Sequence, residues 1–158
     1  MADLDEIYNT RILEIAGATT RGQRLPKPDA TASAQSKLCG SSITVDLDMR
    51  HGVVTDYGQT VKACLLGQAA ASVVAREIVG TSAEDFRVVA RQMRAMLKDN
   101  GPGPSGRFAD LAMLEPVRHY KARHASTLLV FDAVEAAMAQ IESQQSEPRI
   151  TATNPAAS

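Results

Sequence analysis

Residues 43–63, ITVDLDMRHGVVTDYGQTVKA, carry the clearest strand pattern in the chain and decide its fold class. From Ile43 to Met49 apolar residues alternate with polar ones, which gives a strand with one buried and one solvated face. Residues 50–52, Arg-His-Gly, supply a reversal, and a second alternating run begins at Val53. The sequence therefore predicts a β-hairpin here.

Helical patterns lie on both sides of the predicted hairpin. Residues 3–16 have a loose helical spacing, and 18–36 read as a loop, with Lys37 and Leu38 as candidates for an earlier strand. After the hairpin, helices are predicted at 66–80, 82–98, 108–115 and about 126–140. The fold class is therefore α+β: a small antiparallel sheet of about three strands packed against several helices, with an N-terminal helix and a long C-terminal helix.

The length and composition limit both the organisation and the function. The chain has 158 residues, enough for one domain, which we place at 1–142, with a disordered tail rich in Ser, Gln, Thr, Pro and Ala at 143–158. Seventeen basic and eighteen acidic residues give a net charge of −1, so no electrostatic footprint for nucleic acid is present. No apolar run reaches membrane-spanning length, and the acidic start is untypical of a secretory signal. We expect a cytoplasmic protein with reduced thiols.

Three positions combine reactive or polar side chains with the ends of predicted elements. Cys39 lies just before a strand, Cys64 at a strand-to-helix junction, and Ser126 at the start of the last helix. At such places a side chain projects from a loop while rigid elements fix its position. The gap of 25 residues between the cysteines matches no compact zinc or ferredoxin motif, so the residues alone favour buried cysteines that serve as small hydrophobic groups.

The order of these elements and the residues at their junctions resemble the U-type iron–sulfur cluster assembly scaffold family, which includes IscU, SufU and the N-terminal domain of NifU. The resemblance runs from about Ile7 to Met138. It is carried by three segments, Cys39-Gly40-Ser41 before a strand, Cys64-Leu-Leu-Gly-Gln-Ala-Ala-Ala-Ser at a helix start, and LEPVRHYKARHAS at 114–126. The family has Cys-Gly-Asp, Cys and a third Cys at these places.

Two positions depart from the family pattern. Ser41 stands where the family has Asp, and Ser126 stands where it has its third Cys. A serine hydroxyl is a much poorer iron or zinc ligand than a thiolate because its proton is far less acidic. By resemblance, Cys39, Cys64 and Ser126 are the cluster-binding positions, and Cys39, Cys64 and His124 are the metal ligands. His119 is a further candidate, whereas His51, in the hairpin turn, is expected to be solvated.

The resemblance implies a scaffold, or a carrier of sulfur and iron, rather than an enzyme. Its cargo would be a labile iron–sulfur cluster, with zinc as the alternative metal, passed on to acceptor proteins. Its partners would be a cysteine desulfurase and acceptor or chaperone proteins, without nucleic acid or membrane. The alternative is a degenerate member that binds proteins without full cluster assembly, which the two serines favour. A zinc hydrolase is poorly supported because the chain has no His-rich helical motif and no convincing general base.

Overall fold

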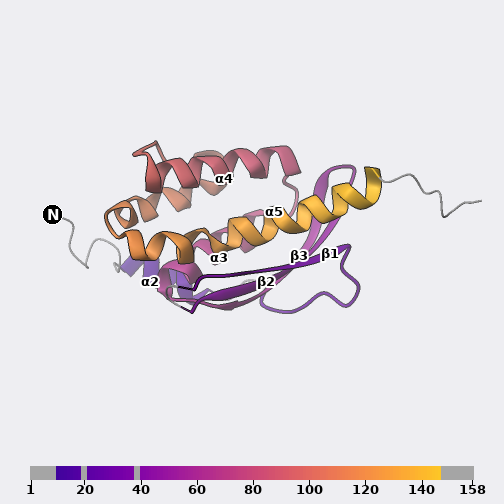
Figure 1. Cartoon of the computed structure of the whole chain (residues 1–158), viewed down its shortest axis with the longest axis horizontal. Helices are drawn as coiled ribbons and strands as arrows, with labels where there is room; N and C mark the ends of the chain where they lie inside the picture. Colours follow the sequence, from indigo (N-terminus) through magenta and orange to yellow (C-terminus); the bar gives the residue numbers. More distant parts are fainter. Residues whose placement is uncertain (1–9, 19–20, 38–39, 147–158) are drawn as a thin grey trace, which may run out of the picture.

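The computed structural model describes residues 10–18, 21–37 and 40–146, with side chains as far as 144. Its described elements form an α+β fold in which helices cover one side of a three-stranded sheet (Figure 1). The strands are β1 (Ala30–Gln35), β2 (Ser42–Arg50) and β3 (Val53–Lys62), antiparallel and in the order β1-β2-β3. The predicted fold class is confirmed, and so is the predicted N-terminal helix over Thr10–Gly17, labelled α2.

The hairpin of β2 and β3 forms as the alternating pattern predicts. Its two-residue turn has His51 at φ 55° and Gly52 at φ 77°, the left-handed pair of a type I′ turn, which matches the natural twist of the strands. At the other end of the hairpin, Ser42 is paired with Lys62. The residues just before β2 and just after β3 therefore lie together, far from the turn.

The prediction of a loop over 18–36 was wrong for its last third, because β1 occupies Ala30–Gln35. Its inward residues are alanines, with Ala30 and Ala32 buried, so the strand lacks the bulky β-branched residues that mark a strand in sequence. Pairing of Ala30 with Leu47 and of Gln35 with Ser42 holds it in the sheet.

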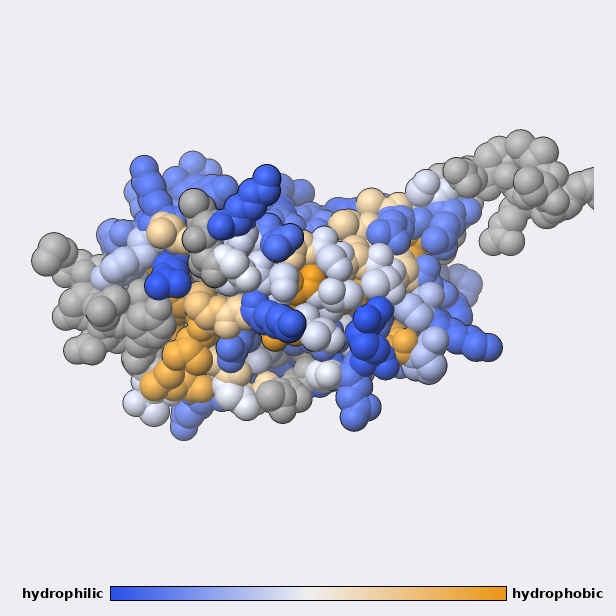
Figure 2. Space-filling model, turned by 60° about the horizontal axis from the view of Figure 1, so that its bottom comes forward, coloured by the Kyte–Doolittle hydropathy of each residue, from blue (hydrophilic) through white to orange (hydrophobic). Residues whose placement is uncertain are grey.

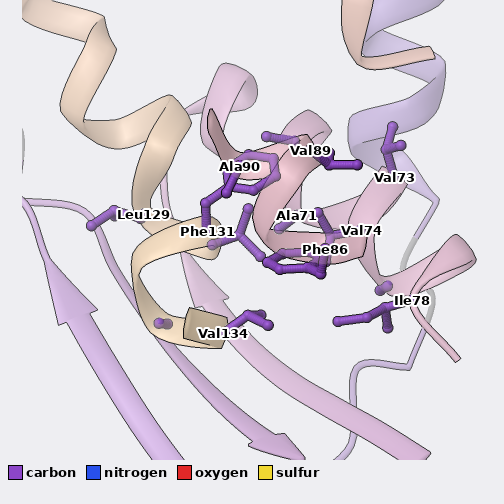
Figure 3. Close-up of a cluster of buried hydrophobic side chains, with 14 of the residues drawn as sticks. Ala71, Val73, Val74, Ile78, Phe86, Val89, Ala90, Leu129, Phe131 and Val134 are labelled. Atoms are coloured by element: carbon purple, nitrogen blue, oxygen red, sulfur yellow. The ribbon is translucent and has the colours of Figure 1, made fainter. Parts of the chain in front are cut away.

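Two helices pack against the sheet and form most of the core. Helix α5 (His124–Ser146) crosses β1 and β2, and α3 (Leu65–Glu77) lies beside it (Figure 1). Helix α3 is buried along nearly its whole length, which its Ala, Ser and Gly residues permit. Figure 3 shows Phe131 of α5 facing Phe86, and these rings stack with centroids 5.7 Å apart. The core thus fixes the two helices whose first turns lie at the hairpin's open end.

Of the helices between α3 and α5, α4 follows the prediction and the next helical segment departs from it. Helix α4 (Ala83–Lys98) begins as predicted, with Ser82 Oγ accepting a hydrogen bond from the Asp85 amide at 3.0 Å. The next helical segment was expected to end before Pro116, but the 3₁₀ helix η1 (Gly106–His119) continues through it. A short 3₁₀ turn, η2 (Lys121–Arg123), leads into α5. Burial of Leu114 and Val117 on either side of Pro116 offsets the donor that proline lacks.

Helix α5 is longer than its sequence pattern indicates. It begins two residues before Ser126 and continues to Ser146, past the predicted end near 140. Arg87 of α4 donates to both carboxylate oxygens of Glu142, at 2.8 and 2.6 Å, so part of the extension is held by an ion pair with a neighbouring helix. Residues 147–158 of the predicted tail lie outside the described residues. Within the described ranges, no helix combines the length and apolar character that crossing a membrane requires.

Candidate functional site

Cys64 occupies the junction between β3 and α3. It is the N-cap of α3, in an extended conformation with φ −65° and ψ 169°, and its side chain is partly exposed. The residue thus has a rigid strand before it and a buried helix after it. This is the predicted placement, and it leaves the sulfur accessible while the backbone is held in position.

Ser126 lies in the first turn of α5 and contacts Cys64 directly. Its Oγ is 3.2 Å from Cys64 Sγ and 3.2 Å from the Oγ of Ser41, the residue just before β2. The relative exposure of Ser41 is 3% and that of Ser126 is 1%. We call Ser41, Ser126 and Cys64 the serine–cysteine cluster. It joins side chains 62 and 85 residues apart in sequence, because three element ends meet at the open end of the hairpin.

Gly67 allows α3 and α5 to approach closely at the serine–cysteine cluster. A Cβ at this position would lie 2.8 Å from Ser126 Oγ, 3.0 Å from Ser126 O and 2.8 Å from Ala63 Cβ. Contacts this short do not occur between real side chains, so any larger residue displaces its neighbours. Sequence reasoning included Gly67 in a small-faced helix, but the pattern alone did not show which helix it faces.

Cys39 lies outside the described residues, so its predicted place in the site stays a prediction. The chain on either side of it is described. The Ser36 amide donates to Ser41 O at 2.8 Å, and the Gly40 amide donates to Ser36 O at 3.0 Å. Gly40 has φ +70°, a left-handed conformation that glycine adopts without strain. These bonds close the connection between β1 and β2 at the end of the sheet where Ser41 contacts Ser126.

The three histidines occupy different surroundings. His124 is buried, and its Nε2 lies 3.1 Å from Val117 O and 3.2 Å from Arg118 O. Because those carbonyls only accept hydrogen bonds, they favour a protonated Nε2, and a metal would then have to use Nδ1. His119 is exposed near the end of η1, and His51 is exposed in the hairpin turn, at the opposite end of β3 from Cys64.

Among the described residues, no group of three or more His, Cys, Asp or Glu side chains is arranged to hold a metal ion. Within those residues the serine–cysteine cluster contains one thiol and two hydroxyls. The cluster therefore has one soft ligand for iron or zinc. The second cysteine of the chain is Cys39.

A second polar cluster lies under the middle of the sheet. Asp46 was expected on a solvated strand face, yet its side chain has 0% exposure. Arg24 donates to both of its carboxylate oxygens at 2.6 and 3.0 Å, and the Leu25 amide and the Thr31 hydroxyl donate at 3.0 and 2.6 Å. We call these four residues the Asp46 cluster. Burial raises the pKa of Asp46, but these hydrogen bonds and the Arg24 charge outweigh burial and hold the pKa below its ordinary value.

The Asp46 cluster depends on a glycine that the sequence pattern does not single out. Gly58 is paired with Asp46 across the sheet, and a Cβ on it would lie 2.2 Å from Gln23 O. Without a side chain at Gly58, the segment around Gln23 can cross the sheet and bring its donors to the carboxylate. With four donors on two oxygens, Asp46 has a structural role.

The surface beside Cys64 is partly apolar. The large hydrophobic side chains exposed among the described residues are Leu13, at 45%, and Leu65, at 36%. Leu65 follows Cys64 directly. Leu13 and Leu65 each lie one helical turn before residues that line a shared cavity, Ala16 and Gln68. Figure 2 shows hydrophobic surface gathered at the left end of an otherwise hydrophilic face, which is the end where α2 lies in Figure 1.

Two arginines on the side of helix α4, Arg87 and Arg94, form ion pairs within the fold. Arg87 pairs with Glu142, and Arg94 donates to Asp132 at 2.8 Å and to Glu135. The hydrogen bonds from Arg87 hold the pKa of Glu142 below its ordinary value. These ion pairs link α4 to α5, so the charges of Arg87 and Arg94 are already paired within the fold.

Comparisons with known proteins agree on one kind of relative. No family model matches the chain. A solved structure of the N-terminal part of a nitrogen-fixing NifU-like protein from Brucella abortus is 57% identical, with a TM-score of 0.88, covering 89% of this chain and 98% of that one. The iron–sulfur cluster assembly scaffold protein IscU of Thermotoga maritima is 22% identical over 135 residues, which are 85% of this chain and 94% of that protein.

A third comparison concerns the fold. A solved structure described as an iron–sulfur cluster assembly scaffold protein for the SUF system from Fervidobacterium islandicum is 15% identical, with a TM-score of 0.78. It covers 86% of this chain and 99% of that chain. At this identity the likeness supports the fold, and it covers a similar share of this chain to the other two.

Proposed function

Since the chain belongs to the family of NifU-like proteins, we propose that it is an iron–sulfur cluster assembly scaffold that holds iron and sulfide as cargo at Cys64 and Cys39 and passes them to acceptor proteins. The work of such a protein is to hold and release cargo, with no turnover of a substrate. A cysteine desulfurase would supply the sulfur, and acceptor or chaperone proteins would receive the product.

The observation that carries this proposal is the contact of Cys64 with Ser126 and, through it, with Ser41. Cys64 and Ser126 are two of the positions that the family resemblance assigns to the cargo, and Ser41 stands where the family has Asp. These three side chains meet at one end of the fold. Cys39 is two residues from Ser41, a separation that the chain spans in about 7 Å when fully extended. In this proposal its thiol supplies the second soft ligand.

The two serines set the strength of cargo binding in this proposal. Iron in such sites is held mainly by thiolates, and a hydroxyl at Ser126 replaces a thiolate with a weak ligand. With two thiolates, cargo should bind more weakly than at three and exchange more easily. Zinc, which prefers four N or S ligands, would need two more ligands to complete its shell, for example His124 and a ligand from outside the chain.

Anaerobic reconstitution tests the proposal. The chain is incubated with ferrous iron and sulfide, desalted, and examined by absorption spectroscopy and metal analysis. We expect bound iron with a sulfide-to-iron charge-transfer band, and its near loss in Cys64→Ser and in Cys39→Ser. His51→Ala, a matched change at the far end of the hairpin, should leave retention unchanged. Equal and negligible iron in the unsubstituted chain and both cysteine variants would sink the proposal.

A second function is favoured by the burial of the two serines. Ser41 and Ser126 lie within hydrogen-bonding distance of each other and are almost fully buried, whereas a ligand must reach its cargo. Leu65, next to Cys64, and Leu13 on α2 expose apolar surface of the kind that partners cover. A degenerate scaffold that binds a desulfurase without holding a cluster would have these features. In that case Cys64→Ser would keep full affinity for a cysteine desulfurase, while Leu65→Asp would lose it.

A further inference from the structure

A cavity of about 560 Å³ lies between the ends of α4 and η1 and the start of α5. Its lining includes three permanent cations from three different elements, Lys98, Arg118 and Lys121, together with the buried His124. None of the residues that line it is acidic. We call it the basic cavity. Because α5 contributes His124 and Ala125 to its wall, the basic cavity adjoins the first turn that also carries Ser126.

The arginine of the basic cavity is less closely paired than most arginines of the described ranges. Arginines elsewhere in the described ranges are mostly matched by carboxylates within 4 Å, as in the pairs Arg21–Asp56 and Arg50–Asp29. At the basic cavity, the carboxylate recorded near Arg118 is that of Glu115, 3.7 Å away and 56% exposed. Asp99 is exposed next to Lys98 in sequence but does not line the cavity.

Arg118 is fixed in place rather than mobile. Its Nε donates to Met96 O and its Nη2 to Gly101 O, both at 3.1 Å, which ties it to the end of α4. Only 17% of its side chain is exposed. A guanidinium held by neutral carbonyls keeps its full charge, and partial burial strengthens its attraction for an anion.

We propose that the basic cavity binds an acidic segment of a partner protein through carboxylates that pair with Lys98, Lys121 and Arg118. The inference rests on the proposed function for the identity of that partner, a protein that delivers cargo to Cys64 or takes it away. Three cations on separate elements suit several carboxylates along one chain better than one small anion. A segment docked here would lie against the first turn of α5 and hold the partner beside the serine–cysteine cluster.

The test uses the metal-free full chain and a fluorescently labelled octaglutamate peptide with an amidated end, followed by fluorescence anisotropy. We expect binding that weakens as salt rises, because the contacts are between partly exposed charges. Lys98→Ala combined with Lys121→Ala should weaken binding about tenfold, roughly the loss of two ion pairs. Arg118 is left intact because it caps α4. The matched control, Lys27→Ala with Arg91→Ala, removes the same charge from exposed positions that do not line the cavity and should change affinity less than twofold.

Several outcomes would overturn the inference. Equal losses in the two double variants would mean that net charge, rather than the basic cavity, attracts the peptide. Displacement by an equal concentration of inorganic phosphate would indicate a small-anion site. If the Lys98→Ala, Lys121→Ala variant lost binding to phosphatidylglycerol vesicles but kept its binding to the peptide, the cavity would be a membrane-binding surface. Much tighter peptide binding by Asp3→Asn, Asp5→Asn, Glu6→Gln would assign the cavity to the chain's own acidic start.

Iron reconstitution separates this inference from the proposed function. If the Lys98 and Lys121 variant retains as much iron as the unsubstituted chain but neither binds the peptide, the acidic partner is excluded and the scaffold stands. If the peptide binds as expected but Cys64→Ser retains as much iron as the unsubstituted chain, the scaffold falls and the docking surface stands.

Discussion

The Asp46 cluster, at the middle of the sheet, and the serine–cysteine cluster, where three element ends meet, are both largely buried polar groups, but their hydrogen bonds are satisfied to different degrees. Asp46 is fully buried, charged and bound by four donors. In the serine–cysteine cluster the two serine hydroxyls are uncharged, and Cys64 is partly exposed. A group whose hydrogen bonds are all made within the protein stabilises the fold, whereas a thiol with an open side remains available for chemistry. We therefore expect the stability of the fold to depend on the Asp46 cluster, and the proposed cargo binding to depend on the serine–cysteine cluster.

The largest expected effect is the loss of the Asp46 carboxylate. Asp46→Asn keeps the shape but places an amide donor where a donor already lies, and it leaves buried hydrogen bonds unmade. We expect the free energy of unfolding to fall by about 3 kcal/mol, measured by urea denaturation. Glu142→Gln is the matched control, since Glu142 also receives two bonds from one arginine but is 48% exposed. It should cost about 1 kcal/mol or less. Equal costs would show that the burial of Asp46 adds nothing to the stability supplied by its hydrogen bonds.

The next effect tests whether the site end is as tightly packed as the Asp46 cluster. Gly67→Ala places a methyl group 2.8 Å from Ser126 Oγ, so α5 must shift or the side chain must turn. We expect a loss of about 2 kcal/mol in the free energy of unfolding, together with lower iron retention. Gly17→Ala is the control, because nothing lies within 4 Å of its added Cβ. A Gly67→Ala chain as stable as this control would show that α3 and α5 can separate freely.

A smaller effect is the acid dependence of stability. The pKa of Asp46 is lower in the folded chain than its value of about 3.9 in an unfolded one. Its contribution is therefore fully present above pH 4 and is lost as the pH falls through the folded pKa. Urea midpoints measured between pH 7 and pH 3 should show the unsubstituted chain approaching Asp46→Asn in acid. Both should retain a residual slope, because ion pairs also lower the pKa of Asp110 and Glu142. If the difference between the urea midpoints of the two chains stayed constant from pH 7 to pH 3, Asp46 would contribute no charge-dependent stability.

The hairpin and the helix that follows Ser82 could be predicted from the sequence because their patterns are local: each depends on residues within the element itself. Alternation from Ile43 to Met49 and the capping serine at Ser82 are local signals, and the structure confirms both elements. Strand β1 gave no such signal, because its inward residues are alanines. A side chain that adds little apolar area produces a weak pattern even when the backbone pairing is complete.

The site could be predicted only in part, for the same reason. The junctions at Cys64 and Ser126 follow from element ends, and the structure brings the two side chains into contact. The burial of Asp46, the closeness of Gly67 to Ser126 and the basic cavity depend on which elements pack together. These features arise from contacts between elements that are distant in sequence, and the spacing of residues within one element does not predict such contacts.

The smallest expected effect on stability accompanies the largest gain in cargo binding. Ser126→Cys adds a soft ligand beside Cys64 at the position where the family resemblance places a third thiolate. Because Gly67 has no side chain to meet the larger sulfur, we expect a loss of less than about 1 kcal/mol in the free energy of unfolding. Iron retained after anaerobic reconstitution should rise severalfold. Ser105→Cys, which adds a thiol at the exposed start of η1, should change retention little. If Ser126→Cys gains no more iron than Ser105→Cys, the serine–cysteine cluster is not a cargo site, and its partly exposed thiol has another use.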